Sequence, residues 1–273
     1  MQTPINPFKQ ALARGDVQFG LWLGLASGYS AELCAGVGFD WLLIDGEHAP
    51  NDIPSLLAQL QGIASASTPE ALPPGRPRSH PVARVPIGTG DVGTALIKQY
   101  LDAGVQTLMV PMVDTPEQAA QVAAACRYPP EGVRGMGAAL ARATRWQQYP
   151  QYVHEANAQI CLLVQVETAT AMHNLDAIAA TPGVDGVFIG PADLSASMGY
   201  PGQPDHPEVL AAIHQGLQRI RQAGKAPGIL GFNPAQVQPW LDAGAQFVAV
   251  GIEALVLKHG LRQLLTTYRP GCP

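Results

Sequence analysis

Two acidic side chains follow neighbouring apolar runs near the middle of the chain. Residues 187–189 (Val-Phe-Ile) are a short run of β-forming types that ends at Gly190-Pro191, and Asp193 follows. Upstream, the apolar run 160–166 leads into Glu167 in the same way. A single aspartate in such a place is often only a helix cap or a turn residue. Two carboxylates at the ends of neighbouring strands could instead hold one divalent cation through oxygen ligands.

A second group of ionisable residues follows two earlier apolar runs. Asp45 ends one of them and His48 follows three residues later. A carboxylate beside an imidazole is the usual way to orient a general base. Asp45 and Glu47 could equally cap the next helix. Arg84 ends the other run, where a buried guanidinium needs an anionic partner from the protein or the substrate. Trp22, at the end of the first run, fits a pocket wall and a plain core position equally well.

The positions of the lysines and the lack of a phosphate-binding motif argue against several classes of enzyme. The lysines stand only at 9, 98, 225 and 258, and none lies at the C-terminal end of a predicted strand. A Schiff-base aldolase or a pyridoxal enzyme needs a lysine at such a place. A glycine-rich phosphate loop is also absent from the sequence, which weighs against nucleotides and sugar phosphates. The other histidines, at 80, 154, 173, 206, 214 and 259, are expected at the surface.

The elements that must position these residues repeat along the chain. Leu101–Pro111 and Leu241–Gly251 both read as a helix end, a glycine and a buried strand, which predicts parallel strands with helical crossovers. Eight such units in about 250 residues predict one (β/α)₈ barrel, an α/β TIM barrel, over residues 1–273. An open doubly wound sheet is the alternative, but no Gly-x-Gly-x-x-Gly turn follows the first strand. The predicted strands are 19–24, 41–45, 82–85, 107–111, 160–166, 186–190, 227–231 and 246–251, with helical spacing at Ile97–Leu101, Glu117–Cys126, His173–Ala180 and Pro207–Ala223.

Two stretches break this rhythm. Ser65–Pro81 is rich in proline and without periodicity, so we expect a surface excursion between a helix and the third strand. Tyr128–Trp146 is expected to be a long ordered loop after the fourth strand, on the face that carries the chemistry.

The composition limits the partners. The chain has 273 residues, 47% of them hydrophobic, and a formal charge of −5. The acidic balance argues against nucleic acid, and no apolar run approaches the roughly 20 residues that cross a bilayer. The four cysteines, at 34, 126, 161 and 272, have no metal-type spacing. We therefore expect a reducing compartment, the cytoplasm.

Several runs together resemble one family. They are residues 20–25, 40–50, 106–113, 128–135, 163–168 and 186–195, among them Asp-Trp-Leu-Leu-Ile-Asp-Gly-Glu-His-Ala-Pro and Gly-Val-Phe-Ile-Gly-Pro-Ala-Asp-Leu-Ser. They resemble the 4-hydroxy-2-oxoheptane-1,7-dioate aldolases, which are class II, pyruvate-dependent hydroxyketoacid aldolases of aromatic catabolism. The resemblance covers nearly the whole chain.

The resemblance implies an activity and a set of site residues. It implies cleavage of 4-hydroxy-2-oxo acids to pyruvate and an aldehyde such as succinic semialdehyde, with a divalent Mg²⁺, Mn²⁺ or Co²⁺ ion. It also implies a hexamer that exchanges C-terminal helices, for which residues 255–265 are apolar enough. By position, Glu167 and Asp193 would hold the metal, His48 with Asp45 would be the base and Arg84 would stabilise the enolate. The substrate would lie against Trp22, Arg84, Gln165, Gly190, Pro191, Ala192 and Leu230, of which Leu230 is similar to a residue that lines a neighbouring subunit's pocket.

Two other functions remain open on the sequence. A lyase of the citrate-lyase β-subunit type would act on CoA thioesters and would need a basic groove for the CoA phosphates. A non-catalytic oxo-acid binding protein could retain the metal ligands, but binding alone would not require a base such as His48.

Overall fold

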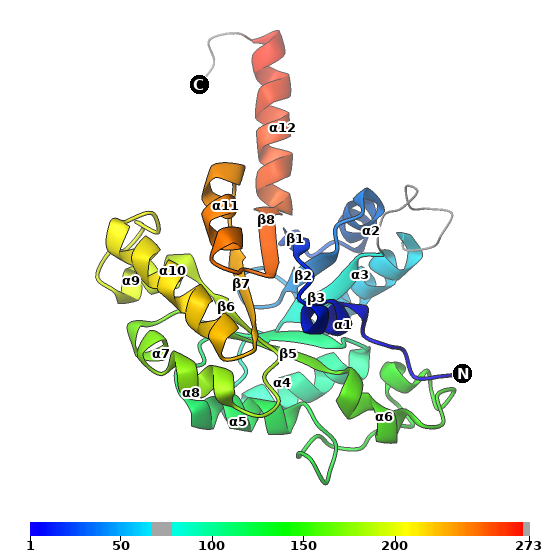
Figure 1. The fold of residues 1–273 in the computed structure, drawn as a ribbon. Helices are drawn as coiled ribbons and strands as arrows, with labels where there is room; N and C mark the ends of the chain where they lie inside the picture. Colours follow the sequence, from blue (N-terminus) through cyan, green and yellow to red (C-terminus); the bar gives the residue numbers. More distant parts are fainter. Residues whose placement is uncertain (67–77, 270–273) are drawn as a thin grey trace.

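Eight parallel strands pair in chain order and close into a barrel in the computed structural model, which describes residues 1–66 and 78–269 (Figure 1). The predicted TIM barrel is therefore confirmed, and each strand lies within two residues of its expected bounds. The strands are β1 (Gln18–Leu23), β2 (Trp41–Asp45), β3 (His80–Arg84), β4 (Thr107–Val110), β5 (Cys161–Val166), β6 (Gly186–Ile189), β7 (Ala226–Leu230) and β8 (Phe247–Ile252).

Helices surround the barrel and occupy the expected segments. The predicted segment 173–180 is divided between two short helices, because Asn174 interrupts it. The helices are α1 (Pro7–Arg14), α2 (Gly28–Val37), α3 (Ile53–Ala66), α4 (Gly90–Ala103), α5 (Pro116–Ala125), α6 (Tyr152–Gln159), α7 (Ala169–His173), α8 (Leu175–Ala180), α9 (Pro191–Ser197), α10 (Pro207–Gln222), α11 (Pro234–Asp242) and α12 (Glu253–Tyr268), with a 3₁₀ turn η1 (Arg142–Thr144).

Strand alternation decides which side chains reach the barrel axis. In β2, Trp41 and Leu43 belong to the interior core, whereas Leu42 and Ile44 pack in the layer beneath the helices. Because successive strand side chains point to opposite faces, the next inward position is Asp45. The alternation thus delivers a carboxylate to the C-terminal mouth of the barrel.

Helix α1 closes the opposite end of the barrel. Its Phe8 lies parallel to the His80 ring at 5.6 Å between centroids and meets the edges of Trp41 and Phe247 at 6.1 Å. The expectation that His80 is a surface residue is wrong. It starts β3, is only 6% exposed and pairs its Nε2 with Thr107 Oγ1 at 2.8 Å.

The segment 128–146 lies on the other face from the one expected. It follows α5 and precedes β5, so it is an αβ connection at the N-terminal end of the barrel and not a loop after β4. Arg134 binds Asp102 at 2.6 Å and Arg142 donates to the Ala103 carbonyl at 2.7 Å, which fastens the segment to the end of α4. The other stretch, 65–81, is shorter than expected because its ends belong to α3 and β3. Residues 67–77 lie outside the described residues.

Helix α12 extends away from the barrel (Figure 1). Its root is fixed by Glu253, whose carboxylate accepts hydrogen bonds from the Gly24 and Leu25 amides and from the Ser30 hydroxyl. Glu253 is the one residue of the helix that is buried, and leucines farther along are more than half exposed. Within the described chain, no helix is both long and apolar enough to span a membrane.

Candidate active site

One cavity of about 380 Å³ at the C-terminal mouth contains every predicted site residue. It lies where the strand ends converge, which is the usual location of catalytic residues in this fold. The predicted residues that line it are Trp22, Asp45, His48, Arg84, Gln165, Glu167, Gly190, Pro191, Ala192, Asp193 and Leu230. Leu230 therefore lines the cavity of its own chain.

Arg84 is fixed in the cavity wall by the neighbouring strand. Asp45 and Arg84 are register partners in the β2–β3 pair. The guanidinium donates to Asp45 through Nε at 2.9 Å and Nη2 at 2.6 Å, and it lies 4.9 Å above the Trp22 ring. Its remaining nitrogen, Nη1, contacts Glu47 at 2.6 Å and Gln165 at 3.4 Å. Two parallel bonds to Asp45 thus leave one edge of the guanidinium directed toward Glu47 and Gln165.

The Asp45 carboxylate is kept ionised by its partners. Burial alone would raise its pKa, but the hydrogen bonds and charge of Arg84 lower it below the usual value. Trp22 Nε1 adds a further hydrogen bond at 3.1 Å. Trp22 is therefore a cavity wall and a polar contact of the site, and it also belongs to the interior core, so both possibilities open from the sequence hold.

The expected contact between Asp45 and the His48 imidazole is not found among the described residues. Asp45 Oδ1 accepts the backbone amides of Glu47 and His48 instead, at 2.9 and 3.3 Å. The His48 side chain is 66% exposed at the rim, and its Nε2 lies 3.7 Å from Glu47 Oε2. The pairing was wrong because strand alternation turns Asp45 into the barrel, whereas His48 lies on the loop beyond it.

Glu47 is an acidic side chain of the site that the sequence analysis considered only as a possible helix cap. It bridges the Arg84 guanidinium and the His48 imidazole. Burial raises the pKa of its carboxyl, and the nearby charge of Arg84 opposes that rise. A carboxylate two residues after a strand and one before a histidine was the signal available in the sequence.

Glu167 is the most deeply desolvated carboxylate of the site. It is 2% exposed, and burial raises its pKa to about 7. Its Oε1 accepts the Met112 amide at 2.8 Å, and its Oε2 accepts the Gln165 amide at 2.8 Å. A Cβ at position 190 would collide with Oε2, so Gly190 is needed to let β6 pass this carboxylate. Met112 has a left-handed φ of 54°, a rare conformation that directs its amide at Glu167.

The acidic groups fit a hard divalent cation. Asp193, in the first turn of α9, lines the same cavity, and the charges of Glu47 and Asp193 both raise the pKa of Glu167. Such mutual repulsion marks a place where a cation would be stabilised, and the donors are oxygens, as Mg²⁺ and Mn²⁺ prefer. No group of three or more His, Cys, Asp or Glu with metal-binding geometry occurs in residues 1–66 and 78–269. The site thus offers a pair of carboxylates and open positions.

A comparison with known families now places the chain. The family described as HpcH/HpaI aldolase/citrate lyase matches residues 18–260. The chain belongs to this family. A hydroxypyruvate/pyruvate aldolase of Pseudomonas aeruginosa is 55% identical, over 100% of this chain and 96% of the relative. A 4-hydroxy-2-oxo-heptane-1,7-dioate aldolase of Klebsiella pneumoniae is 54% identical, over 96% and 94%.

Solved structures agree with the family assignment. An HpcH/HpaI aldolase/citrate lyase family protein from Burkholderia cenocepacia has a TM-score of 0.89 and 39% identity, covering 97% of this chain and 99% of that one. A citrate lyase beta subunit from M. tuberculosis, complexed with oxaloacetate and magnesium, shares the fold with a TM-score of 0.56 and 14% identity, covering 87% and 93%. Both of the relatives above are named aldolases and are more than 50% identical, so the chain is a carbon–carbon lyase of the aldolase type. The two alternatives left open by the sequence are not favoured.

Proposed function

We propose that this HpcH/HpaI family member is a class II aldolase that cleaves 4-hydroxy-2-oxo acids reversibly into pyruvate and an aldehyde. The observation that carries the proposal is one cavity in which Glu167 and Asp193 face Arg84, with His48 at its rim. No lysine occurs among the described residues that line this cavity, so imine chemistry has no amine to use.

Charge stabilisation falls to Arg84 and to a divalent ion. Cleavage of the bond between C3 and C4 leaves an electron pair on C3, which delocalises onto the oxygen at C2. Glu167 and Asp193 would hold Mg²⁺, Mn²⁺ or Co²⁺, which when bound supplies a Lewis acid for that oxygen. Arg84 would donate to the same oxygen through Nη1, which is not bound to Asp45 but contacts Glu47 at 2.6 Å. Preorganised donors of this kind contribute strongly to catalysis.

Proton transfer falls to His48. The hydroxyl at C4 must lose its proton as the bond breaks, and histidine is the side chain that most often accepts one near neutral pH. Glu47, 3.7 Å from Nε2, orients the imidazole in place of Asp45. The exposed position of His48 suits a group that meets the aldehyde half of the substrate at the cavity entrance.

The pyruvate half is held deeper in the cavity. The Gly190–Ala192 backbone lies beside Glu167 and would bind the pyruvate carboxylate, with the Gln165 amide close to Arg84. Trp22 and Leu230 form apolar walls. Relatives of nearly equal identity are named for different substrates. Succinic semialdehyde is one candidate aldehyde for this chain, and we propose that residues at the rim of the cavity select the preferred one.

The proposal extends to the assembly. We infer a homo-oligomer, a hexamer as the resemblance implies, in which α12 is exchanged between subunits; its exposed leucines support this. Free, buried thiols at Cys34, Cys126 and Cys161 support a reducing compartment, the cytoplasm.

The test is a substrate screen of purified protein. Pyruvate should be released from 4-hydroxy-2-oxo acids, and pyruvate with an aldehyde should condense, whereas acyl-CoA substrates should not react. Borohydride added with pyruvate should leave the protein mass unchanged. Cleavage of CoA thioesters alone, or pyruvate binding without turnover, would refute the proposed activity.

A further inference from the structure

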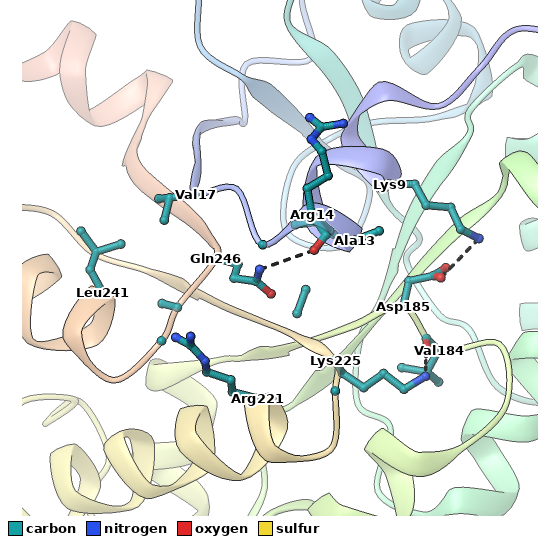
Figure 2. A pocket seen from close by; sticks show the side chains of 16 residues that line it. Lys9, Ala13, Arg14, Val17, Val184, Asp185, Arg221, Lys225, Leu241 and Gln246 are labelled. Carbon is teal, nitrogen blue, oxygen red and sulfur yellow. Dashed lines mark hydrogen bonds and ion pairs between the residues drawn. The ribbon is translucent and has the colours of Figure 1, made fainter.

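A second cavity, of about 500 Å³, lies at the opposite end of the barrel from the proposed active site. Its lining comes from the end of α1 and from the residues just before β1, β6, β7 and β8. Figure 2 shows side chains from α1, from the end of α10 and from the strand starts surrounding one space, with Gln246 among them. A volume of this size falls in the range of roughly 300–1,000 Å³ that is typical of small-molecule sites.

The lining carries a local positive charge in an acidic protein. Lys9, Arg14, Arg221 and Lys225 all line the cavity, and Asp185 is the one carboxylate among the described residues of its lining. The chain as a whole carries a formal charge of −5. A recess lined by cations concentrates anions, because its low-dielectric walls focus the field of those charges.

Most of these cations are incompletely neutralised. The Arg221 guanidinium has no hydrogen bond or ion pair within the described part of the chain. Among the described residues, Lys225 donates only to the Val184 carbonyl, at 2.7 Å, although an ammonium has three donors. Arg14 donates to Asp16 Oδ2 through Nε at 2.9 Å and through Nη2 at 2.6 Å, but both side chains are largely exposed, and water weakens such surface pairs. Lys9 is the exception, since it contacts Asp185 at 3.2 Å.

Helix ends explain part of this arrangement. Arg14 and Arg221 stand in the last turns of α1 and α10, where cations interact favourably with terminal carbonyls. Arginines at helix ends would interact with these carbonyls equally well on a flat surface. This interaction does not account for a recess that brings two helix ends and the starts of four strands together around unpaired donors.

We propose that this cavity binds a small metabolite with two or more anionic groups, phosphate or carboxylate. The ligand bridges α1 on one side and Arg221 with Lys225 on the other. Because it joins segments that are far apart in the sequence, its binding stabilises the barrel. The site is separate from the catalytic cavity, so pyruvate does not compete for it.

Calorimetry and thermal unfolding of the full-length protein test this. Saturating Mg²⁺ and pyruvate occupy the catalytic cavity, and the ionic strength is held constant. Fructose 1,6-bisphosphate and tricarballylate represent the two anion chemistries, and sorbitol is the uncharged control.

One or both anions should bind with one site per chain and raise Tm, since a ligand that binds the folded state stabilises it. Binding of the bisphosphate alone assigns a phosphate ligand, and binding of tricarballylate alone a carboxylate. The proposal is overturned if neither binds.

Charge reversal locates the site. Arg221→Glu and Arg14→Glu should each weaken binding by about tenfold or more, the effect of losing one charge-assisted hydrogen bond. Lys98→Glu makes the same charge change on the exposed surface of α4, away from the cavity, and should stay within about twofold. All three variants should retain wild-type pyruvate affinity. An equal loss in Lys98→Glu would mean diffuse charge attraction and would also overturn the proposal.

Discussion

The Arg84 guanidinium is held on one edge by Asp45 and presents the other edge to Glu47 and Gln165. Arg84→Lys keeps the charge but loses the two parallel bonds and the contact over Trp22. We expect the barrier for retro-aldol cleavage to rise by about 3–4 kcal/mol, the loss of one oxyanion donor. Steady-state kinetics with a 4-hydroxy-2-oxo acid measure this.

Protein stability provides the control for that variant. If Arg84→Lys keeps kcat within a fewfold of wild type but unfolds at a lower temperature, then Arg84 serves the fold and its catalytic assignment is wrong.

His48 should affect bond cleavage more than pyruvate binding. His48→Ala should lower kcat by roughly 10²–10⁴, the usual contribution of a positioned acid–base group. Pyruvate affinity by calorimetry should change far less, because Arg84 and the Gly190–Ala192 backbone remain. Asp45→Asn should instead resemble Arg84→Lys, since Asp45 holds the arginine and not the imidazole. Joint loss of metal and pyruvate binding in His48→Ala would identify His48 as a metal ligand, and normal turnover would exclude it as the base.

The sequence predicted the members of the site better than their contacts. Glu167, Asp193 and Arg84 could be found because each lies at or just beyond the C-terminal end of a buried strand, and parallel strand ends must converge in a closed barrel. The partner of Asp45 could not be found in this way. Whether a side chain after the strand end turns inward or outward depends on loop geometry, which moved His48 to the rim and brought Glu47 to the arginine.

Helix α12 leaves most of its apolar side chains uncovered in a single chain. Leu257, Leu261, Leu264 and Leu265 occur at helical spacing and are each more than 50% exposed. Leu261→Glu should therefore lower the molecular mass measured by light scattering, because a charge on the buried face of an exchanged helix is costly. Thr266→Glu, on the opposite side of the helix, is the matched control. An unchanged mass in Leu261→Glu would remove α12 from the interface.

The strands were predictable to within two residues because buried strands have a strong compositional signal, whereas the bounds of helices such as α4 were not. The segment 128–146 was assigned to the wrong face for a specific reason. Its length and its arginines resemble a functional loop, but α5 intervenes between β4 and this segment and reverses the direction of the chain. Arg134 and Arg142 therefore stabilise the end of α4 and take no part in the site.

At the scale of the whole molecule, the closed end of the barrel should make folding stability depend on pH through His80. Burial lowers the pKa of this histidine from 6.5 to about 3. Between those values the unfolded chain binds a proton that the folded chain does not, so this contribution to stability is complete above pH 6.5 and declines as pH falls. The decline approaches about 1.4 kcal/mol per pH unit.

Denaturant unfolding of His80→Gln between pH 7 and 4 checks this. The variant should lose this part of the pH dependence, even if it is less stable at pH 7 because the contact with Phe8 is gone. His154→Gln, at an exposed histidine of α6, should keep the wild-type slope. An identical slope in His80→Gln and wild type would mean that His80 is not buried in its neutral form.

The central claim is that paired carboxylates at the barrel mouth make this a metal-dependent aldolase. The most direct test is the rate of pyruvate release from a 4-hydroxy-2-oxo acid after removal of metal with EDTA and desalting, followed by addition of Mn²⁺ or Co²⁺. Cleavage should stop in the stripped protein and return with the ion, and Glu167→Gln should not recover at the same ion concentration. Full activity in a preparation shown by elemental analysis to contain no metal would contradict the account.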